Sequence, residues 1–405
     1  MLKYVHFLSA LFFVTCIAAC GGGSSTTAAT QIYDTLPLTP APAPANANMG
    51  GAVQGGSISA KFANYSVSTF SGVAKSAGFG NYSTINGPPA LYNHPTDITT
   101  DGSNFYVADY GNSVIRKIDS TGKVTHLACT DAITGLPIGF YRPTGITISP
   151  DGTQLYVVDF GSNTIRFIDL SNNNKVTIIG STTGLSGSVD VAVVPPATTA
   201  DVTLVRFKEP IGITTDGENV YVTDYGNHTV RRIVVATKAV STLAGASGSI
   251  GSSDGIQGAA RFNRPGRITT DRTSLYLTDF GNRTIRKIDI TTATVSTLAG
   301  STGPLSTDDG TSDGTGGAAH FNQPNGITTN GTYIYVTDSY HNTIRRINKL
   351  TGEVKTISGI SRTAGIGGAV DSPGTPSFYT PIGITTNGSS LFVADSYNST
   401  IRRIH

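Results

Sequence analysis

The chain has 405 residues, of which 48 are glycine and only 13% are charged, and it contains no tryptophan. Its formal net charge of +2 supplies neither the positive field that nucleic-acid binding requires nor a polybasic patch for anionic membranes, so neither class of partner is expected. Glycine, serine, threonine and asparagine alternate with β-branched residues and tyrosine, a composition that favours many short strands and turns over helices.

The first twenty residues, MLKYVHFLSALFFVTCIAAC, are organised like an export signal. Lys3 precedes an apolar stretch that is too short and too lightly flanked for a good membrane-spanning helix. The small residues before Cys20 resemble the lipobox of bacterial lipoproteins, in which the cysteine thiol is acylated. This resemblance implies a signal peptide over 1–19, lipidation at Cys20 and a place in the cell envelope, with Gly21 favouring the outer membrane. The alternative interpretation is an ordinary signal peptide with an incidental cysteine.

Residues 20–60 are dominated by Gly, Ser, Thr, Ala and Pro, including the stretches GGGSSTTAAT and TPAPAPANA. This composition predicts a linker, flexible in part and polyproline-like in part. About 40 residues of this kind have a typical end-to-end distance of about 35 Å, so the globular part would stand off the membrane. Cys129 is then the one cysteine left in the globular part, where we expect a buried, inert thiol and no disulfide.

One pattern recurs six times in the rest of the chain, as in PIGITTDGENVYVTDYGNHTVRRI and PNGITTNGTYIYVTDSYHNTIRRI. Each unit reads as a strand, a turn, a second strand ending in Asp, a tight turn and a third strand. Units one to five continue into a fourth strand such as VSTLAG. Because no helical periodicity appears, the repeat predicts an all-β fold, a six-bladed β-propeller with one blade per unit. The units begin at Pro95, Pro143, Pro210, Pro265, Pro324 and Pro381.

The sixth unit stops after its third strand, at His405. A spare copy of the fourth strand, VSTFSG, lies before the first unit at Val67–Gly72. We therefore predict that this N-terminal strand completes the last blade and closes the ring, because an open ring would expose an unpaired strand edge. The propeller domain would span 61–405.

The recurring letters PxGIxxDG, LYVTD and GN, followed by VSTLAG, resemble those of NHL-repeat proteins, whose fold is a six-bladed propeller. The resemblance covers about Val67–His405 and is strongest in units three to six. The second unit departs from the pattern in its long tail, and the first has Asp97 where most others have glycine.

Strand order predicts which turns share a face of the propeller. The turn after each second strand and the long connection to the next blade lie on one face, which we call the loop-rich face. The short turns after the first and third strands lie on the opposite, short-turn face. Since variable loops on a rigid frame are the usual place for binding sites, we expect the bulk of the connections beside the channel mouth to form the site.

Two charged residues interrupt the repeat at the channel mouth. Four units carry glycine two positions after their first proline, but unit one has Asp97 and unit four has Arg267. Blades one and four are opposite in a six-fold ring, and Asn325 lies on the blade beside Arg267. One interpretation is a solvated ion pair that helps to close the channel. The other is a polar ligand or ion held between these residues, with Arg267 taking an anionic group.

The aspartates that end the second strands are tempting metal ligands, but six equivalent sites around a ring do not converge. We expect them to accept amide hydrogen bonds in the turns that follow. The basic residues of IRKI and IRRI also recur in every blade, so they form either a structural pattern or a solvated edge. The aspartates are Asp109, Asp159, Asp224, Asp279, Asp338 and Asp395.

Some propellers are hydrolases or lyases, and one NHL-fold lyase holds zinc with histidines. His228 and His341 lie in the turns after second strands, on the loop-rich face, so they are candidate site residues. The histidines are not paired at ligand spacing, and no cofactor is predicted. A metal-using alternative would place calcium or zinc at the channel mouth, with Asp97, Asn325 and a nearby histidine as ligands.

The sequence thus favours a lipid-anchored propeller in which no catalytic residue set is recognised, so the question whether it is an enzyme is left open. We expect a monomeric binding or interaction module on the bacterial envelope, exposed to the periplasm or the surface. Its partner would be a protein, peptide or carbohydrate on the loop-rich face, with the membrane contacted through the lipid. The alternative function is a propeller hydrolase or lyase with a metal at the channel mouth.

Overall fold

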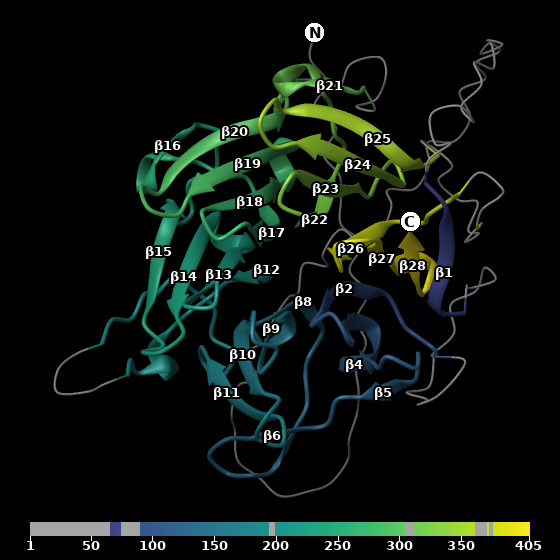
Figure 1. Ribbon diagram of the computed structural model, residues 1–405. Helices are drawn as coiled ribbons and strands as arrows, with labels where there is room; N and C mark the ends of the chain where they lie inside the picture. Colours follow the sequence, from purple (N-terminus) through teal and green to yellow (C-terminus); the bar gives the residue numbers. More distant parts are fainter. Residues whose placement is uncertain (1–64, 74–89, 194–198, 304–311, 361–370, 372–375) are drawn as a thin grey trace, which may run out of the picture. The chain divides into compact units, whose positions relative to one another are not determined.

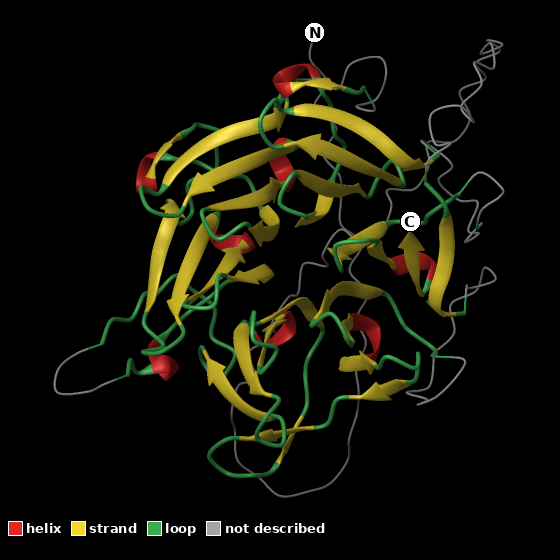
Figure 2. Ribbon diagram, in the orientation of Figure 1, coloured by secondary structure: helices red, strands yellow, loops and turns green. Residues whose placement is uncertain are grey.

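The computed structural model describes residues 65–73, 90–193, 199–303, 312–360, 371 and 376–405, all within the unit Ala52–His405. These residues form six antiparallel sheets, the blades of a β-propeller, which confirms the predicted fold class (Figure 1). The helical segments in the described ranges are single 3-10 turns, seen as the short red pieces in Figure 2. None of the described helices is long and apolar enough to cross a membrane.

Each blade begins at the predicted proline and runs from the channel outward. Blade one contains β2 (Pro95–Thr100), β3 (Phe105–Asp109), β4 (Val114–Ile118) and β5 (Val124–His126). Blade two contains β8 (Pro143–Ile148), β9 (Gln154–Asp159), β10 (Thr164–Asp169) and β11 (Lys175–Ile179). Blade three contains β12 (Pro210–Thr215), β13 (Asn219–Asp224), β14 (Thr229–Val234) and β15 (Val240–Gly245).

The second half of the ring repeats this order. Blade four contains β17 (Pro265–Thr270), β18 (Ser274–Asp279), β19 (Thr284–Asp289) and β20 (Thr294–Gly300). Blade five contains β22 (Pro324–Thr329), β23 (Tyr333–Asp338), β24 (Thr343–Asn348) and β25 (Glu353–Gly359). Blade six contains β26 (Pro381–Thr386), β27 (Leu391–Asp395), β28 (Thr400–Ile404) and, as its outermost strand, β1 (Val67–Gly72).

The N-terminal strand closes the ring as predicted. β1 pairs antiparallel with β28, from Val67 opposite Ile404 to Gly72 opposite Thr400, and Figure 1 shows the purple strand beside the yellow C-terminal one. Val67 is buried, and the Phe70 ring packs edge-on against aromatic rings of blades one and six. The innermost strands also follow one another around the channel, with β26 beside β2, so the first and last blades are neighbours.

The hydrophobic core is divided into clusters between adjacent blades, because each sheet is apolar on both faces. Tyr156, Phe207 and Ile213 pack between blades two and three, for example, and Tyr276, Phe321 and Ile334 between blades four and five. Alternate strand residues therefore point toward the two neighbouring blades, and burial depends on the ring being complete.

A buried carboxylate holds the end of each second strand, as Asp279 illustrates. Its carboxylate accepts hydrogen bonds from the Asn263 amide, the Asn282 side chain and Arg286, each at 2.8 Å. Burial raises the pKa of Asp279 to about 6, against the lowering effect of these donors. The six strand-end aspartates are all fully buried, which agrees with the structural role predicted for them.

The first arginine of each IRKI or IRRI sequence is part of this core, not a solvated edge. Arg286 is fully buried, lies over the Phe262 ring and donates a second ion pair of 2.8 Å to Asp254 in the preceding connection. Asp254 also accepts the amide of Thr297 on the outermost strand. Blades three, five and six repeat the arrangement with Asp224–Arg231–Asp190, Asp338–Arg345–Asp313 and Asp395–Arg402–Asp371.

Because of these contacts between connections and strands, the long connections run along the outer edges of the blades. β16 (Gly255–Ile256) pairs with β20, β21 (Gly314–Thr315) pairs with β25, and β6 (Cys129–Asp131) runs parallel to β11, with β7 (Pro137–Ile138) beside it. Figure 1 shows β6, β16 and β21 at the outer edges of their sheets. In the described ranges, the prediction that the connections gather beside the channel mouth is therefore wrong, because their aspartates pair with the buried arginines of the third strands and their short strands pair along the outermost ones.

Candidate functional site

Glycine is required where neighbouring innermost strands approach each other at the channel mouth. A Cβ added at Gly326 would lie 2.0 Å from the carbonyl oxygen of Ile382, and one added at Gly145 would lie 2.3 Å from that of Ile211. Real Cβ atoms do not approach carbonyl oxygens this closely, so these positions exclude side chains. Blades one and four differ, because Asp97 and Arg267 occupy the position of this glycine. The channel must therefore accommodate their two side chains.

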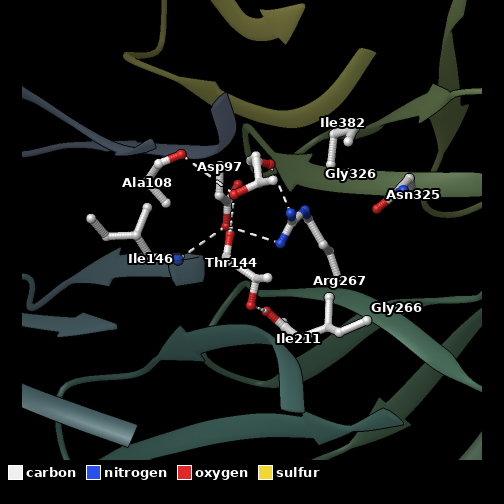
Figure 3. A network of polar contacts seen from close by, with 12 residues as sticks. Asp97, Ala108, Thr144, Ile146, Ile211, Gly266, Arg267, Asn325, Gly326 and Ile382 are labelled. Carbon is white, nitrogen blue, oxygen red and sulfur yellow. Dashed lines mark hydrogen bonds and ion pairs between the residues drawn. The ribbon is translucent and has the colours of Figure 1, made fainter. Parts of the chain in front are cut away.

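Asp97 and Arg267 do meet across the channel (Figure 3). The Arg267 Nη1 lies 3.5 Å from the Asp97 Oδ2, and the same oxygen accepts a hydrogen bond of 3.1 Å from the Ile146 amide. The Arg267 Nη2 donates to the Thr96 carbonyl oxygen at 2.7 Å. Both residues are buried, so the pair is a plug inside the channel and not the solvated pair of the first interpretation.

Burial dominates the electrostatics of the pair. It raises the pKa of Asp97, which the charge of Arg267 and the Ile146 amide oppose, and it lowers the pKa of Arg267, which Asp97 opposes. The Nε and Nη1 atoms of Arg267 have no hydrogen-bond partner within the described part of the chain. A buried pair with incomplete hydrogen bonding contributes little net stability, although removing one partner alone is costly.

A cavity of about 60 Å³ lies in the channel beneath this pair. Asp97 and Arg267 form one end of it, and an isoleucine and a threonine from each innermost strand form the walls. The threonines follow the isoleucines along the strands, so the cavity extends from the pair toward the short-turn face. Its size corresponds to a few water molecules, and the pair separates it from the loop-rich face.

Asn325 is near the mouth but does not join the pair. Its carbonyl oxygen accepts a hydrogen bond of 2.9 Å from the Thr278 hydroxyl, which also accepts the Arg267 amide at 2.9 Å. Figure 3 draws the Asn325 side chain apart from Asp97 and Arg267, with no interaction linking them. The backbone of Asn325 therefore helps to join blades four and five, while its half-buried side chain stays available.

The two candidate histidines occupy different positions in their turns. His228 has a left-handed backbone (φ 59°), and its Nδ1 accepts the Arg264 amide at 3.0 Å. Burial lowers the pKa of His228, and the charges of Arg264 and Lys208 add to this effect. His341 takes the place of the usual asparagine, with its Nδ1 3.4 Å from Asp338, and is fully buried.

No group of three or more His, Cys, Asp or Glu side chains in the described ranges is arranged to hold a metal ion. The carboxylate of Asp97 already faces Arg267, so these residues do not favour the calcium or zinc site at the mouth. Cys129 is buried in blade two and burial raises the pKa of its thiol to about 12, in agreement with an inert thiol. Cys20 lies outside the described residues.

Sequence reasoning missed a set of side chains that surrounds the mouth on the loop-rich face. The residue before the first proline of every blade has a left-handed backbone, with φ between 51° and 63°, which is uncommon for residues other than glycine. These six residues and the tyrosines that contact them form what we call the rim. The rim comprises His94, Tyr110, Tyr141, Arg142, Glu209, Tyr225, Arg264, Gln323, Thr380 and Tyr397.

Hydrogen bonds between blades fix the backbone of the rim. The Arg142 amide donates to the Ser113 hydroxyl at 3.3 Å, and the Glu209 amide donates to the Asn163 side chain at 2.8 Å. Each acceptor is the left-handed residue that follows a second-strand turn of the preceding blade, as His228 is for Arg264. The sequence did contain a signal for the rim. The first proline recurs in all six units, but the residue before it varies from unit to unit.

Comparison with known proteins supports the fold and identifies a repeat. The NHL repeat family matches residues 207–233, which include the first two strands of blade three. The chain is 33% identical over 168 residues to NHL repeat-containing protein 2 of Bos taurus, covering 38% of this chain and 22% of that protein. It is 29% identical over 196 residues to the chloroplastic protein SUPPRESSOR OF QUENCHING 1 of Arabidopsis thaliana, covering 46% and 18%. The chain thus spans about a fifth of the curated relatives that it matches.

Solved propellers resemble the chain over a larger share of its length. An auxiliary nutrient binding protein from Bacteroides thetaiotaomicron covers 84% of this chain and 76% of its own, with a TM-score of 0.61 and 16% identity. A structural genomics protein of unknown function from the same organism has a TM-score of 0.60 and 20% identity, covering 84% and 75%. At these identities the likeness shows the fold alone.

Proposed function

We propose that the protein is a binding module of the bacterial envelope, which holds a protein, peptide or carbohydrate ligand on the rim of its loop-rich face. The observation that carries the proposal is the variation of the rim within a strict repeat. The proline, the left-handed backbone and the strand-end aspartate recur around the ring. The side chains before the prolines nevertheless range from Arg142 and Arg264 to Glu209 and Thr380, although no difference in backbone requires this.

Because the channel is closed, a binding site on the surface is favoured, and a site inside the channel is not. The buried pair of Asp97 and Arg267 lies between the loop-rich face and the small cavity below it. A ligand larger than a few waters would therefore rest above the pair and contact the rim. Tyr141 is the rim tyrosine most available to it, with 41% of its surface exposed.

The proposed location rests on the N-terminal sequence. Lipidation of Cys20 would hold the chain to a membrane, and the linker over 20–60 would let the propeller turn freely at about 35 Å from the surface. A Cys20→Ala variant should move from the membrane fraction to the soluble fraction of the cell. A variant that stays in the membrane fraction would contradict the lipid anchor.

The binding site is tested by photo-crosslinking in cells with the full-length protein. A photoreactive amino acid at Tyr141 should give a discrete crosslinked adduct, whereas the same amino acid at Arg272, on the short-turn face, should not. Both positions are exposed, so they form a matched pair. Equal adducts at both positions, or adducts at Arg272 alone, would contradict a site on the loop-rich face.

A further inference from the structure

We infer that the ligand of the rim is an acidic segment of a protein partner, an inference that rests on the proposed binding function. The rim combines tyrosine with arginine, the residue types that dominate binding energy at protein interfaces. The positive charge of the rim and the fixed backbone of its two arginines, Arg142 and Arg264, favour a partner chain that carries carboxylates.

The two faces of the propeller differ in charge. On the loop-rich face, twelve positions have a left-handed backbone: the six before the first prolines and the six in the turns after the second strands. They include three arginines and one acid, Glu209. The arginines are Arg142, Arg264 and Arg283, and Lys208 precedes Glu209. On the short-turn face, the first turn of blades one to four carries an aspartate at the equivalent position, namely Asp101, Asp151, Asp216 and Asp271. The short-turn face also carries basic residues, such as Lys123, Arg272 and the Lys349 that pairs with Asp271, but these four aspartates make it the less favourable face for an acidic partner.

Two arginines of the rim are held in place without a carboxylate partner. The Arg142 guanidinium carbon lies 5.8 Å from the Tyr110 ring centre and 5.5 Å from that of Tyr141. The Arg264 guanidinium carbon lies 5.8 Å from the Tyr225 ring centre. No ion pair joins either arginine to a described acidic residue, although the arginines of the blade interiors each have one.

Each of these guanidinium groups has N–H donors available for a carboxylate. Besides the hydrogen bond to the hydroxyl of Tyr110 or Tyr225, a guanidinium has further donors, which can form two parallel hydrogen bonds to one carboxylate. The backbone of Arg264 is fixed by His228 and that of Arg142 by Ser113, so the backbone of the rim loses little conformational entropy on binding. Arg142 and Arg264 belong to blades two and four, with blade three between them, so an extended acidic segment that crosses blade three can contact both.

An acidic polysaccharide is the competing ligand with the same charge. Sugar rings bind proteins by stacking on open aromatic faces, but Tyr110 and Tyr225 already carry a guanidinium, and Tyr225 is only 6% exposed. Among the rim tyrosines only Tyr141 is exposed, so the rim offers more arginine donors than open ring faces, which favours a peptide.

The inference is tested by titrating the full-length protein, purified in detergent, with a fluorescein-labelled peptide of ten glutamates at low salt. We expect binding that weakens as salt rises, and a loss of about tenfold or more in affinity for the Arg142→Gln/Arg264→Gln variant. The matched control is Lys123→Gln/Arg272→Gln, which removes the same charge from exposed positions on the short-turn face, one of them also left-handed. Its affinity should stay within about twofold of wild type.

The outcomes separate this inference from the proposed function. Absence of binding to the glutamate peptide, or an equal loss in the rim and control variants, overturns the acidic segment. Binding of polygalacturonate at least tenfold tighter than the peptide, lost in the rim variant, also overturns it but leaves a binding site on the rim. Failure of the crosslinking pair at Tyr141 and Arg272 would instead overturn the proposed function itself.

Discussion

Two kinds of buried aspartate–arginine pair exist in this propeller, and their surroundings differ. In the outer part of a blade, Arg286 contacts two carboxylates, two carbonyl oxygens and an aromatic ring, and the arrangement recurs around the ring. In the channel, Arg267 has one carboxylate at 3.5 Å and one carbonyl oxygen, and its position is glycine in four blades. The repeated pair joins strands and connections within one blade, whereas the unique pair fills the channel and contacts the innermost strands of blades one, two and four.

This difference indicates that the side chains that recur in every blade are those that maintain the fold. The rim, like the channel pair, lies where the blades differ from one another while the backbone stays the same. Substitutions should therefore fall into two classes, which the following experiments separate.

The largest effect is expected from removing the strand that closes the ring. Deletion of residues 1–72 would expose the edge of β28 and the cluster around Val67. We expect a loss comparable with the whole free energy of unfolding, about 5–15 kcal/mol, seen as loss of cooperative unfolding in denaturant. Deletion of 1–60 is the control and should unfold like the full chain. Cooperative unfolding of the longer deletion at an unchanged midpoint would contradict ring closure.

Breaking one repeated pair should cost less. Arg286→Met leaves Asp279 buried without its cation, and we expect destabilisation of about 3–5 kcal/mol in equilibrium unfolding. Arg264→Met, on the rim, should change stability by less than about 0.5 kcal/mol. Similar losses for the two variants would remove the distinction between repeated and unique residues.

The channel pair should behave differently from the repeated pair when both partners are removed. Asp97→Gly alone leaves Arg267 without its carboxylate and should cost about 1–3 kcal/mol. Asp97→Gly/Arg267→Gly restores the glycine of the other blades and should lie within about 1 kcal/mol of wild type. A double variant that is less stable than either single one would show that the pair holds the ring together.

The pH dependence of stability that arises from Asp271, on the short-turn face, should be smaller still. Partial burial raises the pKa of Asp271, but hydrogen bonds from Lys349, Thr273 and Ser274 outweigh it and leave that pKa well below its ordinary value. Because the folded-state pKa is depressed, the stabilisation is present above about pH 4 and is lost as pH falls further. Allowing for solvent screening, Asp271→Asn should remove about 0.5–1 kcal/mol of this acid dependence.

Asp216→Asn provides the comparison, because Asp216 occupies the same turn of blade three and no described lysine forms an ion pair with it. Denaturant unfolding at pH 6 and pH 3 measures both variants. An equal change of acid dependence in the two would contradict the role of Lys349.

Much of the fold could be predicted because local patterns and the repeat agree. The strands, the closing role of Val67–Gly72 and the opposition of Asp97 and Arg267 follow from position within a six-fold ring. The second carboxylate partner of Arg286 could not be predicted, since Asp254 is 32 residues away in a connection of variable length. Without that contact, the course of the connections along the outer edges was not predictable either.

The rim was missed for a different physical reason. A proline disfavours the helical region for the residue before it and normally keeps that residue extended, so a left-handed backbone before six prolines contradicts the local rule. Only tertiary contacts, such as the hydrogen bond from Arg264 to His228, stabilise this conformation. The candidate histidine thus proved to orient the rim residue beside it.

The claim that matters most for function is that the ligand lies on the loop-rich face, and paramagnetic NMR tests it directly. A spin-labelled peptide of ten glutamates is added to isotope-labelled full-length protein, and broadening of backbone amide signals is mapped. Our account predicts broadening at Tyr141 and Arg264 and none at Ser103 or Arg272. Broadening confined to Ser103 and Arg272, on the short-turn face, would contradict it.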